Sequence, residues 1–276
     1  MIVVPVLLTA CRQGSSSNAI AQVQKSEELI HHGKTIESRF TPPNGFKRTA
    51  KDSTSFAHYL RNLPLHPKDS PVRYYNGQTK PNTNVYAAVV ALPIGKKDLH
   101  QCADAVMRLR AEYLYAQKQY HQIHFNFTNG FQVDYSEWML GKRIVVKGNT
   151  VSWKQKTQPS NTPKDFWSYL ETIFTYAGTA SLSQEMKSKS MSDLAIGDVF
   201  IKGGFPGHAV IVVDLAIHPE TKEKVFLLAQ SYMPAQEIQI INNPNNADFS
   251  PWYSAKEQEI LITPEWVFKT TDLKRF

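Results

Sequence analysis

Long hydrophobic runs and clusters of charge are missing from this sequence of 276 residues. Beyond the N-terminal residues no stretch of about 18 apolar residues occurs, so the rest of the chain is not expected to span a membrane. The 31 Lys and Arg outnumber the 24 Asp and Glu and give a net charge of +7, yet the basic residues are scattered. Nucleic-acid binding needs a clustered basic patch, so we expect no nucleic-acid partner.

Signatures of several catalytic classes are also absent. The nine histidines form no His-Glu-x-x-His pair and no Cys/His cluster, so no zinc site is indicated. No glycine-rich phosphate-binding loop occurs, and the segment 178–181 (Gly-Thr-Ala-Ser) lacks the glycine-flanked serine of a nucleophile elbow. We therefore expect no metal and no cofactor.

The chain has the composition of an ordinary globular protein, with 42% hydrophobic and 11% aromatic residues. A chain of this length forms one large domain or two small ones. Helical patterns come mostly before the main run of strand patterns, which favours an α+β fold over alternating α/β. We predict a single α+β domain over residues 39–276.

Only two cysteines occur, and the first, Cys11, follows a short apolar N-terminal segment. Leu8-Thr9-Ala10-Cys11 resembles a bacterial lipobox, at which a leader is cut and the new N-terminal cysteine receives lipid. Residues 1–11 would then be the signal, and the polar residues 12–38 a flexible linker. The resemblance implies a membrane partner through the lipid on Cys11 and a cell-envelope location, periplasmic or on the outer-membrane face. The alternative is an apolar N-terminal strand.

Cys102 lies at the start of the strongest helical pattern in the chain. Apolar positions at three- and four-residue spacing form one buried stripe: Leu99, Cys102, Val106, Leu109 and Tyr113. Asp98 can cap this helix, with Gln101 three residues later, so Cys102 falls in the first turn. A helix N-terminus and a nearby imidazolium both lower the pKa of a thiol. If Cys11 is lipidated, Cys102 has no disulfide partner, and it is either a nucleophile or a small buried apolar residue.

A glycine-rich turn leads into an apolar run that begins at His208. The run 208–214 is apolar on both faces, which is typical of a strand buried on both sides. A polar ring there needs a partner, because an unpaired buried polar group costs about 1–3 kcal/mol. If 208–214 and 225–231 form a hairpin, His208 lies beside Gln230 or Ser231. Such a partner can hold one ring nitrogen, as in a Cys–His arrangement, or be a purely structural contact.

Local patterns predict the remaining elements. They are helices beginning near 56, 134 and 162, hairpins 72–75/84–92 and 143–147/150–154, and strands 198–201, 225–231, 237–241 and 259–262.

Several other side chains are candidates for substrate contact. The backbone N–H of Cys102, with an upstream side chain such as Tyr86, would supply oxyanion donors. Ser231, Tyr232 and Gln236 lie at and just after the end of the predicted strand 225–231, and aromatic and glutamine side chains can line a sugar or peptide cleft.

Two strand motifs carry a resemblance to a known enzyme family. The segments 197–200 (Gly-Asp-Val-Phe) and 207–212 (Gly-His-Ala-Val-Ile-Val) resemble strands of NlpC-type cell-wall endopeptidases, of the papain-like superfamily. The resemblance implies a papain-like core, an antiparallel sheet packed on helices, with large insertions. It implies Cys102 as nucleophile, His208 as base, Gln230 as the orienting residue and cell-wall peptide as substrate. The family's Asp-Cys-Ser-Gly is here Gln-Cys-Ala-Asp.

A second resemblance covers most of residues 36–276. Segments 99–110, 204–213 and 228–236 are similar to a family of exported bacterial proteins, frequent in Bacteroidetes and catalogued as domain of unknown function 4846. It implies an envelope location and no particular activity.

These observations lead to one hypothesis and two alternatives. We expect an envelope cysteine hydrolase or amidase that acts on a cell-wall peptide or related amide through Cys102 and His208. The first alternative is a non-catalytic envelope lipoprotein that binds a glycan or peptide in a cleft lined by aromatic and glutamine side chains. The second is a structural protein of an envelope assembly.

Overall fold

One large antiparallel sheet organises the residues that the structure describes, which are 29–256 and 259–276 of this computed structural model. Nine strands form it: β1 (Lys47–Arg48), β2 (Tyr86–Val89), β7 (Lys187–Ser188), β8 (Val199–Lys202), β9 (His208–Ile217), β10 (Lys224–Gln230), β11 (Gln239–Ile241), β12 (Tyr253–Ser254) and β15 (Leu273–Arg275). The order is β2-β11-β10-β9-β8-β15-β7, with β1 added on β9 and β12 on β10. The α+β class predicted from the sequence is confirmed.

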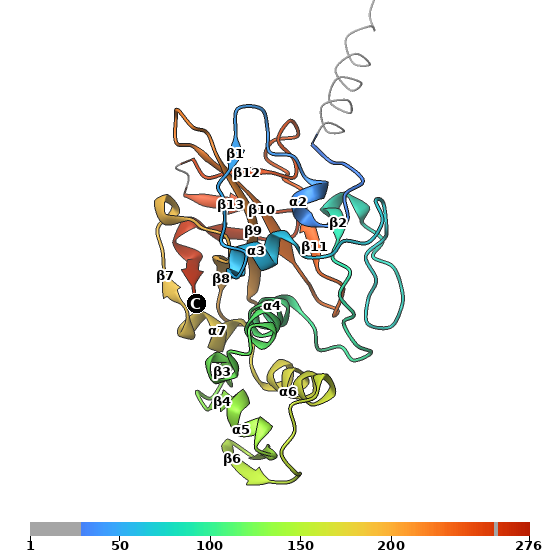
Figure 1. Ribbon diagram of the computed structural model, residues 1–276, viewed down its shortest axis with the longest axis vertical. Coiled ribbons are helices and arrows are strands. Elements are labelled where there is room, and N and C mark those ends of the chain that lie inside the picture. Colours follow the sequence, from blue (N-terminus) through green and yellow to red (C-terminus); the bar gives the residue numbers. More distant parts are fainter. Residues whose placement is uncertain (1–28, 257–258) are drawn as a thin grey trace, which may run out of the picture.

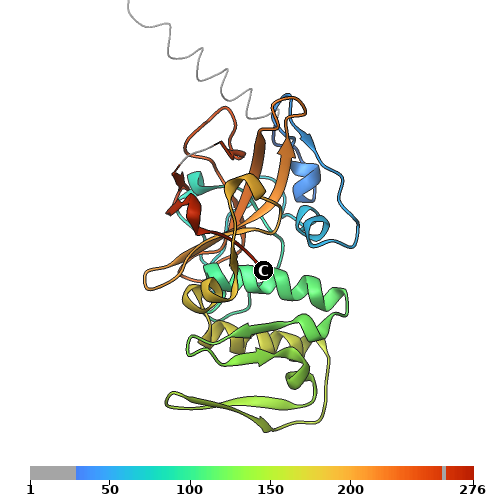
Figure 2. The same cartoon turned by 90° about the vertical axis from the view of Figure 1, so that its left-hand side faces the viewer.

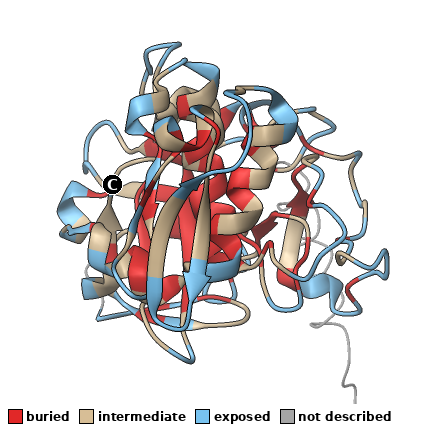
Figure 3. Cartoon of the chain, turned by 90° about the horizontal axis from the view of Figure 1, so that it is seen from below, coloured by how far each residue is buried: buried red, intermediate tan, exposed pale blue. Residues whose placement is uncertain are grey.

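The long strand β9 lies at the centre of this sheet, and its residues are buried from His208 to Ala216. Alternate side chains enter two different apolar clusters. Ala209, Ile211 and Val213 face one cluster, and Val210 and Val212 face the other. The prediction of a strand buried on both sides is therefore confirmed, and Figure 3 shows the buried centre between exposed loops.

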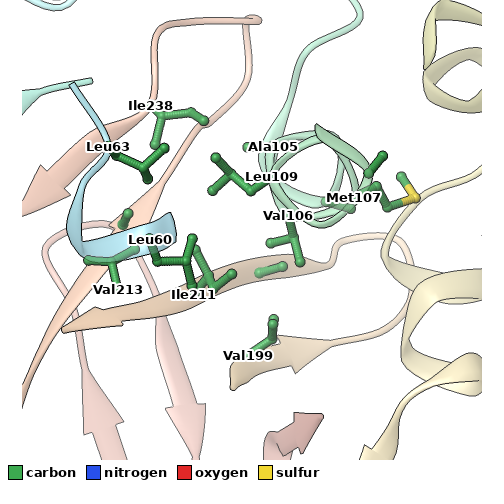
Figure 4. Packing of buried hydrophobic residues seen from close by; sticks show 14 of the residues in the cluster. Leu60, Leu63, Ala105, Val106, Met107, Leu109, Val199, Ile211, Val213 and Ile238 are labelled. Carbon is green, nitrogen blue, oxygen red and sulfur yellow. The ribbon is translucent and has the colours of Figure 1, made fainter. Parts of the chain in front are cut away.

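Helix α4 (Cys102–Ala116) packs against one face of the sheet, on β9. In Figure 4 the side chain of Val106 projects from α4 toward β9, near Ile211, and the side chain of Leu109 projects toward Leu63. Leu60 of α3 (Phe56–Arg61) lies near Ile211. Val106 and Leu109 are almost completely buried. Burial of such a side chain contributes about 1.5–3 kcal/mol, so this stripe fixes α4 on the strand that carries His208.

The chain between α4 and the central strands forms a separate layer. Figure 2 shows it stacked on the side of α4 away from the sheet. It contains the hairpins β3 (His124–Asn126)–β4 (Gln132–Asp134) and β5 (Lys142–Lys147)–β6 (Thr150–Gln155), and the helices α5 (Tyr135–Met139) and α6 (Pro163–Tyr176). Helix α7 (Thr179–Glu185) follows α6 and contacts α4, β3 and the sheet strand β8. The residues of this layer account for the long separation in sequence between Cys102, the predicted nucleophile, and His208, the predicted base.

The other short elements complete the outline in Figure 1. They are α2 (Ile36–Arg39), the hairpin β13 (Ile260–Ile262)–β14 (Val267–Lys269) and the 3-10 turns Thr83–Val85, Tyr120–Gln122, Met191–Asp193 and Thr270–Asp272. No helix among the described residues has both the length and the apolar character needed to cross a membrane.

The hairpin predicted between 72–75 and 84–92 is wrong. Strand β2 pairs with β11, which comes much later in the chain. The turn after residue 75 closes only an isolated bridge between Arg73 and Thr79, while Tyr74 bridges to Gln236. The apolar side chains of Ala88 and Val89 are buried in the large sheet, and this burial outweighs the local turn signal.

The predicted boundary between linker and domain at residue 39 is also wrong. Leu29 and Ile36 are buried, and Thr35 caps α2 by accepting a hydrogen bond from the N–H of Ser38. Arg39 is buried too, and its guanidinium donates to the carbonyls of Gly33 and His66. Residues 29–38 therefore belong to the folded part. The predicted signal at 1–11, Cys11 and the linker residues up to 28 lie outside the described residues.

Candidate active site

Cys102 is the first residue of α4. The helix begins there because the N–H of Gln101 donates to Oδ2 of Asp104 at 2.9 Å, which closes the first turn. Asp98, the cap predicted from the sequence, instead accepts a hydrogen bond from the N–H of Ala235 at 2.7 Å. The helix starts later than predicted, and the prediction that Cys102 lies in its first turn is confirmed.

The sulfur of Cys102 lies where the ladder between β9 and β10 ends. The last pair of that ladder is Ile211 with Ala229, so Ala209 is paired only with Ile201 of β8. The N–H of Ala209 is directed at the Cys102 thiol, where it favours the thiolate. Cys102 thus lies against the backbone of the residue that directly follows His208. Among the described residues no hydrogen bond joins the side chains of Cys102 and His208. The imidazole stacks on Phe268, which belongs to the cluster that Val210 and Val212 enter.

Burial decides the protonation state of this thiol. Cys102 is 8% exposed, and burial, with the carboxyl of Asp104 as a second cause, raises its pKa to about 11. The N–H groups of Ala103, Ala209 and Cys102 itself oppose the rise without cancelling it. The start of the helix therefore lowers the pKa of Cys102, as the sequence predicts, but removal of the anion from water has the larger effect and the net shift is upward. At neutral pH Cys102 is a thiol.

His208 opens β9 and is 1% exposed. Its Nε2 lies 2.9 Å from Oε1 of Gln230, so the contact predicted from the hairpin is confirmed. Burial lowers the pKa of His208 to about 4, the hydrogen bond to Gln230 opposes this shift, and the charge of Lys80 adds to it. The imidazole is neutral at neutral pH.

Three aromatic rings enclose the imidazole of His208. Tyr232 meets it edge to face with 4.8 Å between ring centres, Trp266 lies at 5.4 Å, and Phe268 stacks at 5.8 Å. The pKa of Tyr232 is raised by burial and then by Glu265 and Cys102. Tyr232 therefore lies close to both predicted catalytic residues.

A charged pair behind Gln230 fixes the direction of its amide. Nε2 of Gln230 donates to Oε2 of Glu265 at 2.6 Å, and Nζ of Lys80 forms an ion pair with the same oxygen at 2.7 Å. Oε1 of Gln230 is then the atom that accepts from His208. Nε2 of His208 therefore carries the hydrogen, and its Nδ1 holds the lone pair.

The sequence analysis missed Lys80 and Glu265. They lie 185 residues apart, and no local pattern joins them. A buried lysine is a signal only once its burial is known, because most lysines are exposed.

The other predicted contact residues have structural partners. Ser231 is fully buried, and its hydroxyl donates to the carbonyls of His100 and Gln236 at 2.9 and 2.8 Å. Oε1 of Gln236 accepts from Lys80 at 3.2 Å. The hydroxyl of Tyr86 accepts a hydrogen bond from the N–H of Val72 at 3.1 Å.

Cys102 opens onto a cavity of about 230 Å³. Its lining comes from the start of α4, the α6–α7 junction, the glycine-rich turn before β9 and the loop after β10: Gln101, Cys102, Ala103, Asp104, Phe174, Ala177, Gly178, Thr179, Gly204, Phe205, Pro206, Gly207 and Met233. Two large apolar side chains of this lining are exposed, Phe205 at 86% and Met233 at 58%. Tyr86 is not part of the lining.

Gly207 fits closely into the turn that positions His208. A Cβ there would lie 2.3 Å from the hydroxyl of Thr179 and 2.5 Å from the carbonyl oxygen of Gly204. We expect Gly207→Ala to lower the free energy of unfolding by about 1–3 kcal/mol, because the turn must shift. Urea unfolding measures the loss. Gly178→Ala is the matched control on the same cavity, because its Cβ meets nothing within 4 Å; equal losses in both variants would contradict the argument.

Within the described residues, no group of three or more His, Cys, Asp or Glu side chains is placed to hold a metal ion. A family model described as Domain of unknown function (4846) matches residues 36–275. The chain belongs to this family. The match begins at the first residue of α2 and includes Cys102, His208 and Gln230. No curated protein and no solved structure matches the chain.

Proposed function

We propose that this member of family 4846 is a papain-like cysteine hydrolase that attacks an amide carbonyl through Cys102. The observation that supports it best is the chain of contacts from Glu265 through Gln230 to His208. This chain of contacts leaves the lone pair of His208 on its Nδ1. The N–H of the following residue, Ala209, is directed at the Cys102 thiol. An amide side chain that orients a histidine in this way is the third part of a Cys–His arrangement.

The resting pair in this mechanism is a neutral thiol and a neutral imidazole. As the Cys102 sulfur attacks the carbonyl carbon, Nδ1 of His208 takes the thiol proton, and the carbonyl electrons move to oxygen. The N–H groups at the start of α4 face the developing oxyanion. His208 then gives its proton to the leaving amine, and the C–N bond breaks. Water, deprotonated by His208, attacks the thioester and releases the acid and the Cys102 thiol.

The proposed location is the cell envelope, with a lipid on Cys11 as the membrane anchor and a cell-wall peptide as the substrate. These proposals rest on the lipobox resemblance and on the strand motifs around His208.

A binding protein without catalysis is the second candidate. The low exposure of Cys102 and the two exposed apolar side chains at the cavity, Phe205 and Met233, favour it. In that case the cavity would hold a glycan or peptide, and the His208–Gln230 contact would be structural.

The two candidates differ in how Cys102 reacts with an acyl donor. We expect 4-nitrophenyl acetate to give a burst of one nitrophenolate per chain and an acetyl group on the Cys102 peptide, found by mass spectrometry. Cys102→Ala should abolish the burst, and Cys11→Ser should leave it unchanged. A burst of equal size in Cys102→Ala would refute the proposed nucleophile.

A further inference from the structure

The cavity beside Cys102 contains one ionisable carboxyl that has an unsatisfied oxygen. Asp104 is 6% exposed, and its Oδ2 accepts from the N–H of Gln101. Its Oδ1 is buried and has no hydrogen-bond partner. A buried acceptor without a partner costs about 1–3 kcal/mol, so it gains from a ligand that donates to it.

The charge of the cavity points to the kind of donor. None of the described residues that line it is basic. Burial raises the pKa of Asp104 to about 8, and only backbone N–H groups oppose the rise. A cation next to this carboxyl would remove that penalty, whereas a second carboxylate would add to it.

The rim of the cavity is apolar. Phe205 and Met233 are largely exposed there, and Phe174 lies in the wall. Exposed apolar side chains of this size favour contact with a hydrocarbon chain. The cavity therefore combines an apolar entrance with an acidic interior next to the sulfur.

We propose that this cavity is the subsite for an aliphatic primary amine of the substrate, whose ammonium donates to Oδ1 of Asp104 while its methylene chain packs on Phe205 and Met233. As the substrate subsite of a hydrolase, it rests on the proposed function. It makes a lysine-like amine the preferred neighbour of the scissile bond and disfavours an acidic one.

The charge preference can be measured at the sulfur itself. Aminoethyl and sulfonatoethyl methanethiosulfonate are similar in size and opposite in charge, and mass spectrometry of the Cys102 peptide gives the rate for each. The rates are measured at pH 8.5, where Asp104, with a pKa of about 8, is mostly ionised. The ratio of the two rates at Cys102 is divided by the same ratio for mercaptoethanol, and we expect the result to favour the cationic reagent by about tenfold. The net charge of +7 favours the anionic reagent elsewhere, so this preference must come from a local carboxyl.

Asp104→Asn keeps the shape of the side chain and should return the ratio to within about twofold of the mercaptoethanol value. Glu112→Gln, on the same helix but outside the cavity, should keep the wild-type ratio. The proposal would be overturned if the wild-type ratio favours the anionic reagent. It would also be overturned if Asp104→Asn keeps the wild-type preference for the cationic reagent. The reagents need only an accessible thiol, so this result is independent of the burst experiment that tests the hydrolase.

Discussion

Replacing His208 by alanine is expected to slow the acylation of Cys102 at pH 7 by about 10²–10⁴-fold, the contribution of a positioned general base. The thiol pKa of about 11 leaves very little thiolate at this pH, so attack depends on transfer of the proton to Nδ1 of His208. The rate of the nitrophenolate burst measures the effect. Unfolding in urea should show that the variant is folded under the assay conditions.

The pH dependence of that rate distinguishes a general base from a structural histidine. With a His208 pKa of about 4, the wild-type rate should rise as the imidazole loses its proton and stay flat through neutral pH. It should rise again only as the thiol ionises toward pH 11. In His208→Ala the plateau should disappear, and the rate should increase tenfold per pH unit with the thiolate fraction.

Gln230→Ala is the graded control for this experiment. It removes the acceptor for Nε2 of His208 but leaves the base, so the plateau should remain at a lower rate. If the pH profiles of wild type and His208→Ala coincide, His208 is a structural residue, and the binding-protein alternative becomes the better explanation.

Most helices and strands of this fold could be predicted from local sequence patterns. Thr162-Pro163 begins α6, and the Gly148-Asn149 turn joins β5 to β6. The apolar run after His208 forms β9, and its hairpin with β10 brings Gln230 to the imidazole. In each case the residues that decide the structure are neighbours in the chain or in one hairpin.

The remaining parts depend on contacts that no local pattern contains. Strand β2 pairs with β11 because its apolar side chains fill the large sheet, and Lys80 meets Glu265 only after both segments have folded. The direction of the Cys102 pKa also required the structure. A helix N-terminus lowers a thiol pKa and burial raises it, and only the folded chain shows that burial is the larger effect.

Asp214 carries the second large prediction. This β9 residue is completely buried and accepts from Nε of Arg61 at 2.6 Å and from Nε of Arg48 at 2.7 Å. The guanidinium of Arg61 also donates to the carbonyls of Thr49 and Leu215. One carboxylate therefore joins β9 to both β1 and α3, which lie in the N-terminal part of the folded chain.

We expect Asp214→Ala to lower the free energy of unfolding by about 3–5 kcal/mol, because it leaves the buried charge of Arg61 without a partner. Urea unfolding at pH 7 gives the value. Arg48→Met should be less destabilising, since the side chain of Arg48 is 18% exposed and that of Arg61 only 3%. The double variant Arg61→Met/Asp214→Leu should regain much of the loss, because it removes both buried charges. A loss below about 1 kcal/mol in Asp214→Ala would mean that water reaches Arg61 and that this ion pair contributes little to holding the N-terminal segment on β9.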